Sequence, residues 1–167
     1  MTATYTLRLG KEDFKFSAAH FTLFPDGSGE LLHGHNYTVR VAVEGEALDA
    51  SGLLVDIASL KKRVRAVCAG YDERTLIPTE SALLGVTVKS GQVEVRFGER
   101  LYQLPERDVV LLPLVNLTME LLARLLWDAV RESLIGSRAR VLEVEVQETA
   151  GQSCAYRAPL PAGTPTP

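Results

Sequence analysis

The residues best suited to metal chemistry in this sequence are its histidines. There are only three, His20, His33 and His35, and they lie close together in the chain. Three neutral imidazoles can hold a tetrahedral Zn²⁺ and leave its fourth position open for water or a substrate. Such an ion would polarise a substrate oxygen and acidify a neighbouring C–H or O–H group. The alternative is that these are surface histidines or form ordinary hydrogen bonds.

Two predicted strands would bring these side chains together. Alternation over residues 13–20 places His20 on one face with Phe14, Phe16 and Ala18. After a turn-rich loop, residues 33–44 alternate again, and His33 and His35 share a face with Tyr37, Val39, Val41 and Val43. The two runs predict a β-hairpin with a long connecting loop, in which the three imidazoles converge on one point.

The remaining pattern predicts two helices and further strands. Asp56 can cap a helix with apolar positions at the 3.6-residue period: Ile57, Leu60, Val64, Val67 and Cys68. A second helix is predicted over residues 118–135, ended by Gly136, with these side chains facing packing surfaces: Leu121, Leu122, Leu125, Trp127 and Ala129. Strands are predicted at 141–147 and 154–160, and residues 84–104 predict an extra β-hairpin or three-strand meander.

Length and composition favour one soluble domain. The 167 residues are 46% hydrophobic, which predicts a single unit over residues 1–160 and a disordered, proline-rich tail at 161–167. The formal charge of −3, without a basic block, argues against a nucleic-acid partner. We see neither a membrane span nor a secretory signal and expect a cytoplasmic protein. Cys68 and Cys154 form no CxxC pair and are expected to be buried thiols.

Five segments of the chain together form a recognisable pattern: FSAAH at 16–20, LHGHNYTVRVAVEGE at 32–46, GLLVDIASLK at 52–61, NLTME at 116–120 and QETAG at 147–151. This pattern resembles the 6-pyruvoyltetrahydropterin synthase and 6-carboxytetrahydropterin synthase family. The resemblance implies an α+β tunnelling fold, with an antiparallel four-stranded sheet, two helices on one face and the order ββααββ. Residues of about 80–113 would be an insertion. A homohexamer, built as a dimer of trimers with pockets at subunit boundaries, is also implied.

The resemblance also implies roles for individual residues. His20, His33 and His35 match the zinc ligands, Glu148 matches the glutamate that anchors the pterin ring, and Thr118 and Glu120 match a second group around the ring. A carboxylate suits the ring because it accepts two parallel N–H bonds. Two alternatives stay open: Glu148 could be an outward residue of an amphipathic strand, and Thr118 only a helix cap.

The chain departs from the family pattern at two places. The family has a cysteine four residues before the first histidine of HGH, and this chain has Gly29 there. The adjacent Glu30 resembles a subgroup of the family in which glutamate replaces cysteine as the general acid/base. The product of that subgroup is 6-hydroxymethyl-dihydropterin. The alternative for Glu30 is a solvated loop carboxylate. Asp72 matches the family's catalytic aspartate, but Glu73 stands where its partner histidine belongs. Two repelling carboxylates in place of an Asp-His pair change the proton relay.

These residues favour one function and leave two alternatives. The favoured function is a zinc-dependent enzyme that acts on the C6 side chain of 7,8-dihydroneopterin triphosphate, with Glu30 and either Asp72 or Glu73 moving protons. One alternative is a pterin-binding protein that has lost turnover, which Gly29 and Glu73 support. The other is a structural oligomer with a silent metal site.

Overall fold

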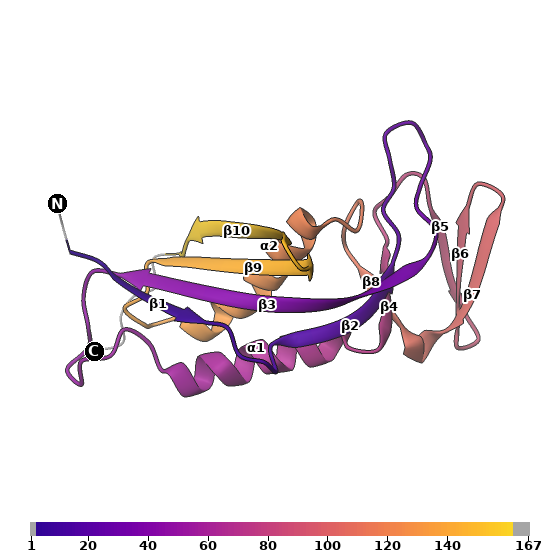
Figure 1. The fold of residues 1–167 in the computed structure, drawn as a ribbon. Helices are drawn as coiled ribbons and strands as arrows, with labels where there is room; N and C mark the ends of the chain where they lie inside the picture. Colours follow the sequence, from indigo (N-terminus) through magenta and orange to yellow (C-terminus); the bar gives the residue numbers. More distant parts are fainter. Residues whose placement is uncertain (1–2, 162–167) are drawn as a thin grey trace.

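A computed structural model describes residues 3–161 and shows the predicted hairpin at the centre of the fold. β2 (Lys15–His20) pairs antiparallel with the long strand β3 (His33–Gly45), and His20 lies directly opposite His33 (Figure 1). The connection folds back on itself as a small loop, in which the N–H of Glu30 donates to the carbonyl of Thr22 (2.9 Å). The hairpin prediction is confirmed.

The sheet contains the four predicted antiparallel strands and extends beyond them. β9 (Val141–Thr149) and β10 (Gln152–Pro159) follow β3, giving the order β10-β9-β3-β2-β4-β8, and β1 (Tyr5–Leu9) also pairs with β3. β4 (Arg74–Pro78) and β8 (Val109–Leu112) are parallel to β2. Sequence patterns did not predict β1, β4 or β8, which are short and do not adjoin a second alternating run across a recognisable turn.

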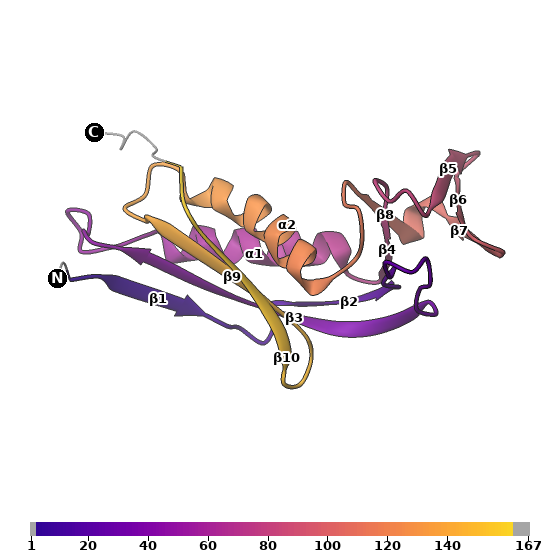
Figure 2. The ribbon, with the colours of Figure 1, turned by 90° about the horizontal axis from the view of Figure 1, so that it is seen from above.

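Two helices cover one face of this sheet, as expected. α1 is Ile57–Tyr71 and α2 is Met119–Arg131, and both lie on the same side of the strands (Figure 2). The Asp56 carboxylate accepts the N–H groups of Ala58 (2.9 Å) and Ser59 (3.3 Å), so the predicted N-cap is present. Leu60, Val64 and Cys68 form the buried stripe of α1.

The second helix is shorter than predicted, and its packed face is rotated. It ends at Arg131 and continues as one 3-10 turn, Glu132–Leu134, before Gly136 takes a left-handed φ of 79°. Its buried residues are Leu122, Ala123, Leu126, Trp127 and Val130. The expected core residues Leu121, Leu125 and Ala129 are only half-buried, because β9 and β10 lie under the neighbouring face.

The predicted extra strands form a three-stranded meander at one end of the molecule (Figure 1). They are β5 (Gly85–Lys89), β6 (Gln92–Phe97) and β7 (Arg100–Pro105), followed by a 3-10 turn at Glu106–Asp108. The meander forms a second hydrophobic core with the β2–β3 connection, β4 and β8, made of Phe21, Leu23, Ile77, Val93, Val95, Phe97 and Val109. It is therefore packed onto the main sheet.

Two sequence predictions concern the boundaries of the domain and of its insertion. Of the predicted tail at 161–167, residues 162–167 lie outside the described residues. The predicted insertion of about 80–113 includes β8, but β8 pairs with β4 and so belongs to the main sheet. No helix in residues 3–161 has the length and apolar character needed to cross a membrane.

Candidate metal and pterin site

The hairpin brings the three histidines together. Each offers one ring nitrogen, and these atoms all lie within 4.8 Å of one another. The ring centroids of His20 and His33 are 4.8 Å apart, and those of His33 and His35 are 4.7 Å apart. Since side chains two residues apart share a face of a strand, the convergence follows from the register of β2 and β3.

The state of these imidazoles suits a metal ion. His20 is buried, and within the described chain neither of its ring nitrogens makes a hydrogen bond of suitable geometry, although Nε2 lies 3.1 Å from Oε1 of Glu148. Burial lowers the pKa of His20, which favours the neutral form that ligates metals. Nδ1 of His33 lies 2.8 Å from the carbonyl of Leu31, a contact that directs Nε2 toward the cluster. The three imidazoles therefore form a group that could hold a metal ion, and imidazole donors suit Zn²⁺ among other transition metals.

Glu148 joins this cluster from β9. Its Oε1 lies 3.1 Å from Nε2 of His20 and 3.5 Å from Nε2 of His35, and it accepts the hydroxyl of Tyr37 at 3.0 Å. The Glu148 side chain is only 12% exposed, so it is not an outward residue of its strand. Burial raises the pKa of Tyr37, and the Glu148 charge adds to this, so the phenol remains a donor.

Glu30 lies near the histidines on the β2–β3 connection. Its Oε2 accepts the N–H of Thr22 at 2.9 Å. Burial raises the pKa of the Glu30 carboxyl, but hydrogen bonds from Thr22 and the nearby His33 and His20 more than offset this, and the pKa falls below its usual value. Glu30 is thus a held, ionised carboxylate rather than a freely solvated one.

Gly29, the position matched to the family cysteine, has little room for a side chain. A Cβ there would lie 2.7 Å from Cε1 of Phe97 and 3.2 Å from the carbonyl oxygen of Thr22. A side chain at this position would therefore have to displace the Phe97 ring or the loop.

The start of α2 is tied to the same connection. Asn116 accepts the N–H of Leu23 (3.0 Å) and donates to its carbonyl (2.8 Å), while the Thr22 hydroxyl donates to the carbonyl of Leu117 (3.2 Å). Asn116 lies in the NLTME segment, but the sequence did not predict a role for its side chain. An asparagine amide can donate to and accept from one backbone residue, as a neighbouring strand does. No local sequence pattern shows which backbone residue such an amide will bind.

Thr118 and Glu120 lie at the N-terminus of α2. The Thr118 hydroxyl accepts the N–H of Leu121 at 3.4 Å, so Thr118 caps the helix. Glu120 is exposed in the first turn. Partial burial, and then the Glu120 charge, raise the pKa of Cys154 on β10. Within residues 3–161, no hydrogen bond or ion pair joins Thr118 or Glu120 to the histidines.

Asp72 and Glu73 are hydrogen-bonded to the backbone of β2 at Ser17. The Asp72 carboxylate accepts the N–H of Ser17 at 2.7 Å, and the N–H of Glu73 donates to the carbonyl of Ser17 at 2.8 Å. Glu73 has a left-handed φ of 56°. Both side chains are exposed, and Glu73 shares an open groove of about 300 Å³ with His35.

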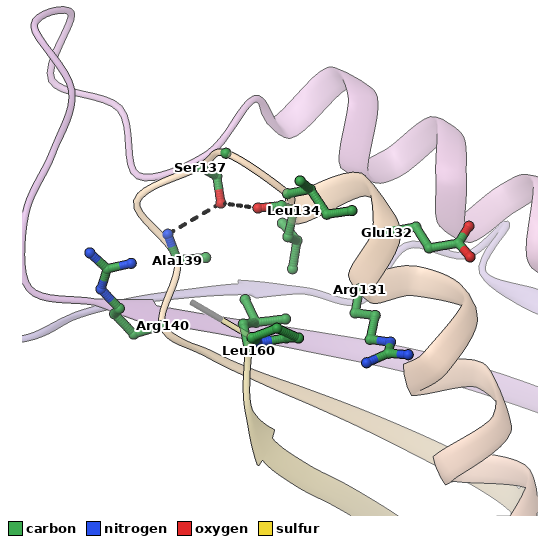
Figure 3. A pocket seen from close by; sticks show the side chains of 10 residues that line it. Arg131, Glu132, Leu134, Ser137, Ala139, Arg140 and Leu160 are labelled. Atoms are coloured by element: carbon green, nitrogen blue, oxygen red, sulfur yellow. Dashed lines mark hydrogen bonds between the residues drawn. The ribbon is translucent and has the colours of Figure 1, made fainter. Parts of the chain in front are cut away.

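A separate pocket of about 350 Å³ lies at the far end of the sheet. Figure 3 shows Arg131, Leu134, Arg140 and Leu160 around it. The N–H of Arg140 donates to the carbonyl of Glu44, near the end of β3 opposite His33. This pocket contains none of the predicted site residues.

Comparisons with known proteins identify the family of this chain. The model of the family described as 6-pyruvoyl tetrahydropterin synthase matches residues 9–159. The 6-carboxy-5,6,7,8-tetrahydropterin synthase of Bacillus subtilis is 31% identical over 156 residues, which cover 92% of this chain and 86% of the relative. A putative 6-carboxy-5,6,7,8-tetrahydropterin synthase of Methanocaldococcus jannaschii is 28% identical, covering 86% and 89% of the two chains.

Solved structures show the same fold. A Plasmodium vivax 6-pyruvoyltetrahydropterin synthase, in a variant whose catalytic glutamate is replaced by alanine, superposes with a TM-score of 0.88 at 25% identity. The match covers 94% of this chain and 99% of that chain. The Plasmodium falciparum enzyme gives a TM-score of 0.87 at 26% identity, with the same coverage. With its histidine hairpin, its sheet and its two helices, the chain belongs to the 6-pyruvoyl tetrahydropterin synthase family and has its α+β tunnelling fold.

Proposed function

We propose that this protein is a zinc-dependent enzyme that cleaves the C6 side chain of 7,8-dihydroneopterin triphosphate and releases 6-hydroxymethyl-dihydropterin. The observation that carries this proposal is the held, ionised carboxylate of Glu30 beside the three histidines. The catalytic glutamate of the Plasmodium vivax relative supports a carboxylate in this role. A cysteine-based route has no support, because Gly29 has no side chain.

The proposed reaction requires deprotonation of one substrate group and protonation of another. To give this product, a base takes the proton of the C2′ hydroxyl, the C1′–C2′ bond breaks to leave an aldehyde on the released fragment, and C1′ receives a proton. Zinc on His20, His33 and His35 would polarise the side-chain oxygens. Glu30 is the base in our proposal and returns the proton as the acid, since one carboxyl can serve both steps.

The ring is proposed to bind through Glu148, with Thr118 and Glu120 beside it. Glu148 has a second oxygen, Oε2, which meets only Gln152 at 3.2 Å within the described residues. Carboxylate oxygens can accept paired N–H groups from a pterin. We also propose a homohexamer, a dimer of trimers, which light scattering would test against the 18.2 kDa of one chain.

A pterin-binding protein without turnover is the second candidate. Asp72 supports it, because its carboxylate already accepts the N–H of Ser17. Glu73 supports it because it stands where the family's partner histidine belongs, so the usual Asp-His proton relay is absent and only Glu30 remains to replace it.

Turnover and binding separate the two candidates. Zinc-loaded protein is incubated with 7,8-dihydroneopterin triphosphate, products are followed chromatographically, and pterin affinity is measured in parallel. We expect 6-hydroxymethyl-dihydropterin, and we expect Glu30→Gln to lower kcat by about a hundredfold or more while pterin affinity persists. The exposed Glu46→Gln is the matched control. Binding without product would support the binder, and absence of binding would refute both.

A further inference from the structure

The meander reaches the loop that carries Glu30 through one arginine. Arg100 begins β7, and its guanidinium donates to the carbonyl of Glu30 at 2.6 Å and to the carbonyl of Gly29 at 3.2 Å. The guanidinium presents its donors in a rigid plane, so one side chain fixes two successive peptide groups.

Phe97 supports the same loop from β6. The Arg100 guanidinium lies 5.3 Å from the centre of the Phe97 ring, and that ring occupies the space where a side chain on Gly29 would be. The Phe97 ring also stacks on the Phe21 ring, with their centroids 6.0 Å apart. Gly29 therefore lies close to both the Phe97 ring of the meander and the backbone carbonyl of Thr22.

Together these contacts fix Glu30 on almost every side. Its N–H is bound to Thr22, its carbonyl to Arg100, and its Oε2 to the N–H of Thr22. Within the described residues, the N–H of Thr22 binds Oε2, and Oε1 is the oxygen left to meet a ligand in the proposed reaction. A base on a connecting loop would otherwise move with that loop.

We propose that the meander β5–β7 is the positioning element for Glu30, with Arg100 and Phe97 as positioning residues. This inference rests on the proposed function, in which Glu30 is the base. A general base must stay within hydrogen-bond reach of the proton it takes, and a misplacement of about 1 Å can cost about a hundredfold in rate. The meander therefore acts on catalysis without touching the substrate.

A double-mutant cycle tests the link to catalysis. Arg100→Met is expected to lower kcat by about ten- to a hundredfold with little change in KM or zinc content. In a Glu30→Gln background the same change should cost less than about twofold, because the group being positioned is already lost. The exposed Arg96→Met, on β6, is the matched control. Equal losses in the two backgrounds would overturn the proposal.

Hydrogen–deuterium exchange tests the positioning itself and does not need turnover. In Arg100→Met, the peptide covering residues 21–32 should exchange faster than in the wild type, while α1 and α2 keep their protection. Unchanged exchange in residues 21–32 would overturn the proposal even if the enzyme is active. An inactive wild type would refute the proposed function instead, and leave this measurement interpretable.

A second pair of variants examines the Phe97 contact. Gly29→Ala should slow turnover about tenfold or more, since the new methyl pushes the ring or the loop. Gly29→Ala with Phe97→Leu should recover part of that loss. Gly85→Ala is the control within the meander, because its Cβ would make an ordinary 3.7 Å contact with Arg96. A double variant no faster than Gly29→Ala would refute the role of Phe97.

Discussion

At the residue scale, Glu148 faces two kinds of partner. Oε1 meets two histidines and a tyrosine hydroxyl, whereas Oε2 meets only Gln152. Period-two alternation already places Glu148 on the face of Leu142, Val144 and Val146, all of them buried. The sequence could not show that β9 pairs with β3 and so brings Glu148 to the histidines. Pairings between distant segments leave no local signature.

Glu148→Gln separates ring binding from metal binding. If the three histidines suffice for zinc, the variant should keep its zinc by elemental analysis. Its pterin affinity should fall about tenfold or more, because a charge-assisted acceptor is replaced by a neutral amide. Glu143→Gln, on the opposite face of β9, should change neither quantity. Loss of zinc in Glu148→Gln would instead identify Glu148 as a fourth ligand.

At the element scale, the sequence predicted elements better than it predicted their packing. The strands around the histidines and the cap of α1 were foreseeable from alternation and from Asp56. The packed face of α2 was not, because Leu121, Leu122, Leu125 and Leu126 form two overlapping apolar stripes. Tertiary contact with β9 and β10 selects the stripe that contains Leu126.

Two equivalent substitutions on α2 measure that choice. Leu126 is fully buried, so Leu126→Ala should lower the free energy of unfolding by about 2–5 kcal/mol. The half-buried Leu125→Ala should cost about 1 kcal/mol. Both replace leucine with alanine in one helix, so intrinsic helix propensity cancels. Urea unfolding of the two variants measures the difference, and a larger cost at Leu125 would contradict the packing.

At the scale of the whole molecule, the candidate metal site lies where two hydrophobic cores meet. Ala18 belongs to the main core under the helices, while Phe21 belongs to the second core under the meander. His20 lies between them on the chain. An ion held by His20, His33 and His35 would therefore stabilise the junction as well as supply chemistry.

Removal of zinc should accordingly weaken one end of the molecule first. Free zinc at about 100 times its Kd adds about 2.7 kcal/mol to stability, which corresponds to about 5–10 °C in Tm for a chain of this size. Chelation should lower the wild-type Tm by that amount and raise hydrogen exchange in the β2–β3 connection and the meander before α1 and α2. His33→Ala should show neither response, whereas Asn36→Ala, on the exposed face of β3, should behave as wild type. Equal Tm values with and without chelator in the wild type would refute a metal-stabilised junction, because an ion bound only to the folded chain must stabilise it.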